Sequence, residues 1–212
     1  MSESHHSSSQ TMPDALNIHM PAWMTEQLNN CDIHYASLKE RMDFAISLAR
    51  NNIEHGTGGP FGAAIFDLDS HQLVAVGVNL VVSSHCSMAH AEMIAISMAQ
   101  QQLGSFDLAD LKLQPERRFE LVTSCEPCAM CFGAIPWSGI KHLVCGARDE
   151  DARAIGFDEG PKMDDWRQAL EQRGISVETD ICRQSAIDAL QHYATHGGAI
   201  YNAGDSKSTG HS

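Results

Sequence analysis

The sequence predicts an α/β protein, a three-layer α/β/α sandwich with a five-stranded mixed sheet. Helical and strand patterns alternate along residues 34–204, which is typical of helices packed on both faces of one sheet. The length of 212 residues and the apolar share of 43% suit one domain with a sizeable core. We expect residues 1–33 to form an N-terminal extension that is at least partly disordered, and residues 205–212 to form a flexible tail.

The elements follow from local patterns. Residues 36–54 predict the first helix, because apolar residues such as Leu38, Met42 and Ala45 recur at helical spacing. Glycines then break the chain before two β-rich runs joined by a short polar turn, residues 61–67 and 72–79, which predicts a hairpin. The remaining elements are a helix at 89–102, a strand at 119–124, a short helix at 126–135, a strand at 141–146, a helix at 164–173, a strand at 175–179 and a helix at 183–195.

Composition narrows the class of substrate. The chain carries 14 Lys and Arg against 27 Asp and Glu, a formal charge of -13, and has no run of basic residues. A protein that binds phosphate backbones is normally basic on at least one face, so this balance favours a small neutral substrate over nucleic acid. The apolar stretches are short and interrupted, and the amino terminus does not resemble a secretory signal. We therefore expect a cytoplasmic protein with no membrane span.

Two short segments carry the candidate chemistry, His90-Ala91-Glu92 and the Pro-Cys-Ala-Met-Cys run at 127–131. By chance, a chain of this composition contains about 0.7 His-x-Glu patterns but only about 0.008 Pro-Cys-x-x-Cys patterns. The second segment is therefore the informative one, and each segment falls at the start of a predicted helix. Three of the 7 cysteines lie between Cys125 and Cys131, which indicates metal or catalytic chemistry in a reducing compartment rather than a disulfide framework.

These residue types suit a catalytic zinc site. Cys128 and Cys131 can supply two thiolates to one tetrahedral zinc ion and His90 a third ligand, which leaves one position for water. Zinc lowers the pKa of that water towards neutrality, so zinc-bound hydroxide is the expected nucleophile, and Glu92 is placed to shuttle its proton. The alternative is a closed structural site with Cys125 as the obvious fourth ligand, but such a site has no use for Glu92.

These residues resemble the cytidine/deoxycytidylate deaminase superfamily, in the branch whose first zinc ligand is His, and within it they most resemble bacterial guanine deaminases. Further segments carry the resemblance: Gly-Pro-Phe-Gly-Ala-Ala-Ile at 59–65, Asn79 at the end of a strand, residues 123–140 around the cysteines, residues 154–161 and Ala-Ile-Tyr-Asn at 199–202. The resemblance covers about residues 36–202. It implies a cytidine deaminase-like fold for a deaminase domain at 34–204, and a homodimer.

The resemblance also implies the roles of individual residues. His90, Cys128 and Cys131 would hold one zinc ion per subunit, and Glu92 and Glu159 would be catalytic. The residues expected to bind the base are Asn79 at its polar edge, Phe61, Trp137 and Phe157 at its flat faces, Tyr201 as a cover and the Ala91 backbone N–H beside the reaction intermediate. A place in the core is the alternative for each of the three residues expected at the flat faces.

The function implied is hydrolytic deamination of guanine to xanthine and ammonia. Members of the superfamily also act on guanosine, cytosine, cytidine or the wobble adenosine of tRNA, so these substrates stay open, as does a triazine such as ammeline. A non-catalytic zinc-binding module is a third alternative. Glu92 argues against it, because a buried carboxylate beside a metal is costly and has no purpose there. The expected partners are a small nucleobase and water.

Overall fold

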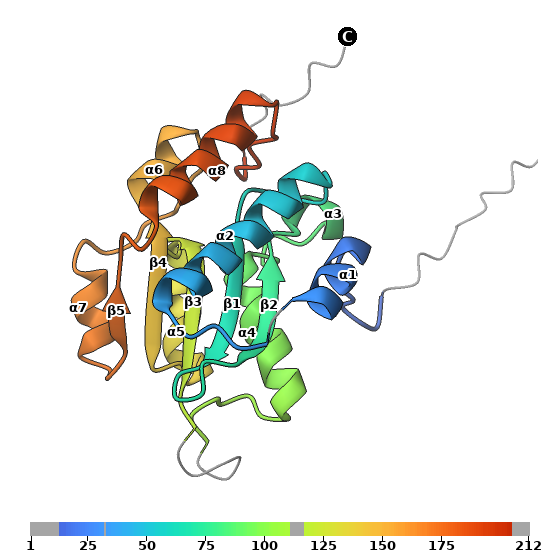
Figure 1. Ribbon diagram of the computed structural model, residues 1–212. Helices are drawn as coiled ribbons and strands as arrows, with labels where there is room; N and C mark the ends of the chain where they lie inside the picture. The colour runs from blue at the N-terminus through green and yellow to red at the C-terminus, as the bar shows by residue number, and fades with distance from the viewer. Residues whose placement is uncertain (1–12, 32, 111–116, 205–212) are drawn as a thin grey trace, which may run out of the picture.

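The computed structural model describes residues 13–31, 33–110 and 117–204, so residues 1–12 of the predicted extension and the predicted flexible tail lie outside the described residues. Five strands form one sheet in the order β2-β1-β3-β4-β5 (Figure 1). Their bounds are Gly62–Asp67 (β1), Leu73–Val78 (β2), Phe119–Cys125 (β3), His142–Ala147 (β4) and Ser176–Glu178 (β5). Strand β1 is antiparallel to both β2 and β3, whereas β4 is parallel to β3 and β5. The predicted five-stranded mixed sheet is confirmed.

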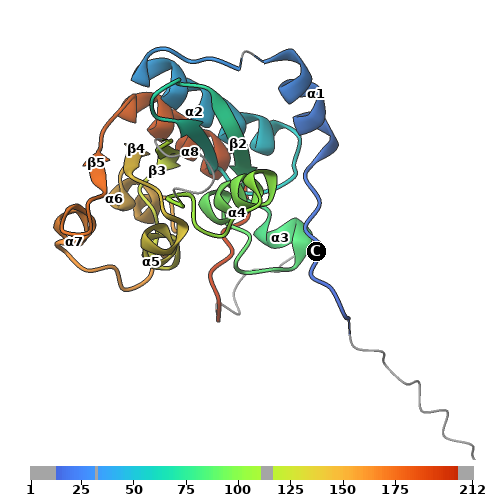
Figure 2. The same cartoon turned by 90° about the horizontal axis from the view of Figure 1, so that it is seen from below.

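Helices cover both faces of the sheet, as predicted. Helices α2 (Leu38–Glu54) and α8 (Arg183–Thr195) lie on one side, and α4 (Ala91–Leu103) and α5 (Ala129–Ser138) lie on the other (Figure 2). The sheet residues alternate between the two cores: Ala64 and Phe66 of β1 face the first pair of helices, and Ala63 and Ile65 face the second. All of these strand residues are buried, because a sheet covered on both faces leaves neither set of side chains to water.

The helices of the structure differ from the predicted ones in their bounds and in their number within the described residues. Helix α2 begins at Leu38 because Ser37 caps it: the Ser37 hydroxyl accepts from the Glu40 N–H at 3.2 Å and the Glu40 carboxylate accepts from the Ser37 N–H at 2.8 Å. Three further helices were not predicted from the periodicity, namely α1 (Ala22–Asn30), α3 (Val81–Ser84) and α6 (Asp149–Ala154). Helix α7 (Trp166–Glu171) occupies part of the predicted helix at 164–173.

Helix α1 belongs to the predicted extension and packs against the domain. The Met24 side chain is buried in the core cluster beneath α2, while most of the other α1 side chains face solvent. One buried side chain in nine residues makes too weak a pattern for periodicity to detect. Among the described residues, the helices are too short or too polar to cross a bilayer.

Candidate metal centre and active site

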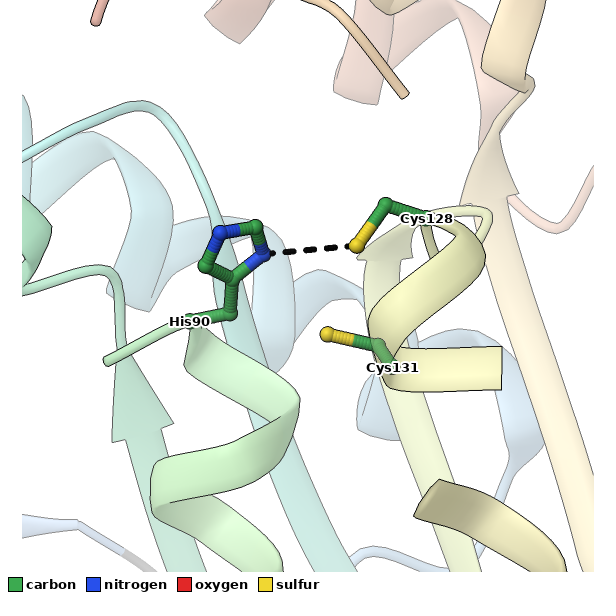
Figure 3. A group of neighbouring side chains, drawn as sticks. All are labelled: His90, Cys128 and Cys131. Carbon is green, nitrogen blue, oxygen red and sulfur yellow. Dashed lines mark hydrogen bonds between the residues drawn. The ribbon is translucent and has the colours of Figure 1, made fainter. Parts of the chain in front are cut away.

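The sheet topology brings the two sequence motifs together. Strands β2 and β3 run parallel to each other because both are antiparallel to β1, so their carboxyl ends lie at the same edge of the sheet. Helices α4 and α5 follow these strands on the same face and begin at that edge, with His90 and Cys128 as the residues that precede them. Figure 3 shows the His90 ring and the Cys128 and Cys131 thiols pointing into the space between the two helix starts.

The donor set fits a zinc ion. The Cys128 Sγ lies 3.5 Å from the His90 Nδ1, and one ligand atom from each of His90, Cys128 and Cys131 falls within 4.8 Å of the other two. Zinc–ligand bonds of about 2.0–2.3 Å at tetrahedral angles place neighbouring ligand atoms about 3.5–3.8 Å apart, so small side-chain adjustments are enough. Two thiolates and one imidazole leave a fourth tetrahedral position for water. Zinc is therefore the cofactor that these residues suit, and Cys128 and Cys131 reach it from a single helical turn.

The electrostatics of the cysteines favour a bound cation. Hydrogen bonds from Cys131 and His90 lower the pKa of Cys128 to about 4, although burial opposes the shift. The hydrogen bond to Cys128, together with burial, raises the pKa of the Cys131 thiol well above its usual value, because two thiolates so close together repel each other. Cys125 stays outside this group: its thiol is buried and donates to the Arg148 carbonyl at 3.6 Å. Within the described ranges, the cluster therefore offers three protein ligands rather than the four of a closed site.

Two buried carboxyl groups lie beside these ligands. Glu92 lies in the first turn of α4, and Glu159 lies in the loop after α6, where its carbonyl accepts from the Ala129 N–H at 2.9 Å. Burial and the negative charge of Cys128 raise the pKa of Glu92 to about 7. Burial and the charges of Cys128 and Glu92 raise the pKa of Glu159 to about 8. Carboxyl groups with such pKa values can take up and release protons near neutral pH, as proton shuttles must.

A small cavity opens directly over this cluster. Its volume is about 180 Å³, below the roughly 300–1,000 Å³ of pockets for drug-sized ligands, so it suits one compact ring system better than a nucleoside. The side chains that line it are those of Phe61, Asn79, Val81, Ser87, His90, Glu92, Glu126, Cys128, Phe157, Asp158, Glu159, Tyr201, Asn202 and Ala203. Most of the residues predicted from the sequence to bind or transform the base therefore line one cavity.

Aromatic rings form one wall of the cavity. The Phe157 ring meets the Phe61 and Tyr201 rings edge-on, with centroids 5.0 Å apart in both pairs. The Tyr201 hydroxyl is buried and has no hydrogen-bond partner among the described residues. Burial also raises the pKa of Tyr201 well above its usual value, so its hydroxyl stays protonated and able to donate. The wall therefore offers flat apolar faces and one unused donor to a ligand.

The structure of the single subunit does not bring Trp137 to the cavity. Its side chain is 83% exposed and does not line the cavity. Helix α5 buries Cys131 and Ile135, which lie four residues apart on one face, and Trp137 follows Ile135 by two residues, on the opposite face. Ala91 is fully buried at the start of α4 and is likewise absent from the lining, so only its backbone N–H can serve the site.

Sequence reasoning missed several lining residues. Ser87 and Asn202 belong to loops, whose course no periodicity reveals. Glu126 was predicted only to begin a helix, yet it is buried and forms ion pairs with Arg167 at 3.1 Å and Lys162 at 3.7 Å. The position of Glu126 directly before the Pro-Cys-x-x-Cys segment was the one signal available for it.

Comparisons with known proteins agree with this site. Residues 36–147 match the cytidine and deoxycytidylate deaminase zinc-binding region. The chain belongs to this deaminase family. Among its relatives is the guanine deaminase of Bacillus subtilis, which is 38% identical over 131 residues, 62% of this chain and 78% of that protein. The tRNA-specific adenosine deaminase of Haemophilus influenzae is 36% identical over 97 residues, 46% of this chain and 51% of that protein.

Solved structures of the family resemble the whole domain. The guanine deaminase of Nitrosomonas europaea is 46% identical, with a TM-score of 0.81, over 88% of this deaminase and 100% of that chain. A structure solved in complex with 2,6-diaminopurine is 47% identical, with a TM-score of 0.82, over 91% of this deaminase and 99% of that chain. The resemblance predicted from the sequence motifs and the cytidine deaminase-like fold are thus confirmed.

Proposed function

We propose that the protein is a zinc-dependent guanine deaminase that converts guanine and water to xanthine and ammonia. One observation carries the proposal: His90, Cys128, Cys131 and Glu92 meet at a cavity sized for one ring system, and Asn79 also faces that cavity. The similarity to guanine deaminases from two bacteria supports guanine as the substrate. The formal charge of -13 argues against a tRNA substrate, whose phosphates need a basic surface.

His90, Cys128 and Cys131 are the residues that would hold the zinc ion. A bound zinc ion supplies a nucleophile at neutral pH by lowering the pKa of a water molecule towards 7. Glu92 takes the proton from that water and passes it to a ring nitrogen of guanine as oxygen adds to C2. Glu159, which also lines the cavity, then delivers a proton to the exocyclic nitrogen as the C2–N bond breaks and ammonia leaves. Glu92 takes the proton of the new C2 hydroxyl, so that C2 becomes the carbonyl of xanthine, and solvent returns this proton to Glu159. The free N–H of Ala91 at the start of α4 favours the negative charge that develops beside it.

Asn79 orients the base. Its Oδ1 accepts from the Val81 N–H at 3.3 Å, which fixes the amide plane and leaves the Nδ2 group to donate to acceptors on the purine edge. Phe61 and Phe157, whose rings meet edge-on in one wall of the cavity, cover one flat face of the base, and the Tyr201 hydroxyl closes over it. The cavity thereby replaces the water around the base with a few fixed polar groups and apolar rings.

The subunits act as homodimers in the cytoplasm. The exposed indole of Trp137, on the helix that carries Cys131, supports a protein contact at that surface. All seven cysteines are free, which supports a reducing compartment, where the ligand thiols stay available to zinc.

Ammonia release by the zinc-loaded protein tests the proposal. Guanine, guanosine, cytosine, cytidine, adenine, ammeline and a tRNA with a wobble adenosine serve as substrates. We expect turnover of guanine and none of the tRNA. Faster turnover of another substrate overturns the assignment to guanine, and release from none of them, with zinc bound, overturns the assignment as a deaminase.

A further inference from the structure

Helix α1 lies before the matched deaminase region, which begins at residue 36, yet it contacts the loop that leads to the active site. The Trp23 ring stacks on His55 at the end of α2, with centroids 5.4 Å apart and planes 6° from parallel. Its indole Nε1 also donates to the Thr57 hydroxyl at 3.0 Å. Helix α1 of the amino-terminal extension therefore contacts the segment 55–60, which runs from α2 to the cavity.

This contact is the first step of a continuous hydrogen-bond path. The Thr57 hydroxyl, having accepted from Trp23, donates to the Asn52 Oδ1 at 2.6 Å. The Asn52 Nδ2 then donates to the carbonyls of Gly59 and Asn79, both at 2.9 Å. Because a carbonyl oxygen can only accept, the Asn52 NH2 group must face the two carbonyls and its Oδ1 must face Thr57. Donation therefore runs in one direction, from Trp23 to the two carbonyls.

The path ends on the backbone of the proposed base-binding residues. The Asn79 N–H donates to the Phe61 carbonyl at 3.1 Å, and the Phe61 N–H donates to the Gly59 carbonyl at 2.9 Å. The two carbonyls that Asn52 binds therefore belong to one hydrogen-bonded unit that carries both cavity side chains. Asn52 is completely buried, so neither carbonyl can exchange this partner for water without a change of structure.

Close packing makes this unit sensitive to small movements. A Cβ atom at Gly58 would lie 1.8 Å from the Asn79 carbonyl oxygen and 2.8 Å from the Asn52 Nδ2. A Cβ atom at Gly59 would lie 2.1 Å from the Tyr201 hydroxyl. Residues 58–59 are thus held between the Asn79 backbone and the Tyr201 side chain with no spare room, and a shift on one side reaches the other.

We propose that Trp23, Thr57 and Asn52 are positioning residues that hold Asn79 in place for substrate recognition, so that the amino-terminal helix forms part of the substrate site. This inference rests on the proposed function for its kinetic consequence. When the path is lost, the Asn79 carbonyl can move, and the Asn79 side-chain amide no longer points correctly at the base. Zinc binding and proton transfer by Glu92, which depend on the starts of α4 and α5, stay intact.

The decisive variant is Thr57→Val, which keeps the side-chain shape and removes the hydrogen bonds of the hydroxyl to Trp23 and Asn52. We expect the KM for guanine to rise about three- to tenfold, the effect of one or two hydrogen bonds, with kcat nearly unchanged and full zinc content. Thr57→Ser retains a hydroxyl and restores the KM. The matched control is Ser47→Ala, which removes a different contact between α1 and α2. In that contact the Ser47 hydroxyl accepts from the Gln27 Nε2 at 3.3 Å. We expect this variant to leave the KM unchanged.

A double-mutant cycle separates positioning from general stability. If Thr57 acts through Asn79, then Thr57→Val has no further effect on the KM in an Asn79→Ala background. If the two effects multiply, or if Thr57→Val lowers the melting temperature and leaves the KM unchanged, Thr57 has only a structural role and the inference is wrong.

A readout independent of turnover distinguishes this inference from the proposed function. The side-chain amide signals of Asn79 in the NMR spectrum of the zinc-loaded protein should shift in Thr57→Val and Trp23→Phe and stay in place in Ser47→Ala. Unshifted Asn79 signals in both path variants overturn the positioning role, whatever the substrate. Lack of guanine turnover by the unchanged protein instead overturns the proposed function.

Discussion

The two halves of the active site are built in different ways. The metal half consists of His90, Cys128 and Cys131, which lie at or within one turn of the starts of two neighbouring helices. The base half, which we propose to bind guanine, draws Asn79 from the residue after β2, the Phe157–Glu159 segment from the loop after α6, and Tyr201 from the carboxyl-terminal segment. The metal half needs correct local turns and one strand arrangement, whereas the base half needs long-range packing across the domain.

This difference separates chemistry from recognition. A CxxC turn and a helix start hold thiolates and a carboxylate with little help from distant residues, so the metal half tolerates change elsewhere. In the base half, residues 58–59 fit between Asn79 and Tyr201 at contact distance. Hydrogen bonds from Thr57 to Asn52, and from Asn52 to the Asn79 carbonyl, hold this arrangement. We therefore expect distant substitutions to alter the KM for the base before they alter zinc binding.

The largest effect should come from the metal half. Glu92→Gln keeps the size of the side chain and removes its ability to shuttle protons, so we expect kcat for guanine to fall about 10²- to 10⁴-fold. Zinc content, measured by atomic absorption, should stay at one ion per subunit, because Glu92 is not one of the three clustered ligands. A variant that turned over guanine at the normal rate would remove Glu92 from the mechanism.

A smaller loss should follow from a change in the base half that touches no zinc ligand. Gly58→Ala places a Cβ atom 1.8 Å from the Asn79 carbonyl oxygen, so the loop has to move. A displacement of about 1 Å can cost about 10²-fold, and we expect kcat/KM for guanine to fall about 10- to 100-fold with zinc retained. Gly133→Ala is the control, because a Cβ atom there would meet nothing within 4 Å in the described part of the chain, apart from its chain neighbours and the backbone of its own helix. Equal kinetics for the two variants would contradict the coupling of the loop to Asn79.

The same contrast explains how far the sequence could predict the structure. The strands and main helices follow from periodicity, and the Pro-Cys-x-x-Cys segment identifies the metal half because its chemistry requires fixed spacing. The exposed position of Trp137 was not predicted, because membership of a motif does not determine which face of the helix a side chain occupies. Helix α1 and the path through Thr57 were not predicted, since one buried Met and hydrogen bonds between distant residues leave no periodic pattern.

A smaller effect is expected for Tyr201→Phe, which removes the buried hydroxyl that has no partner among the described residues. An unsatisfied buried polar group costs about 1–3 kcal/mol, so the variant should be as stable as the unchanged protein or more stable, by up to about 1 kcal/mol in the free energy of unfolding. If the hydroxyl donates to the base, the KM for guanine rises about two- to tenfold at the same time. Denaturant unfolding and steady-state kinetics measure the two quantities. A KM that does not change would assign Tyr201 to packing against Phe157 alone.

The smallest effect on the chemistry should come from Trp137→Ala, since this side chain is 83% exposed and lies outside the cavity. We expect kcat/KM for guanine within about twofold of the unchanged protein, as for an exposed substitution away from special features. Sedimentation should instead show weaker self-association, because a large exposed indole is a typical anchor of a protein contact. An increase in the KM for guanine in variant dimers would mean that Trp137 serves the base half after all, by way of the neighbouring subunit.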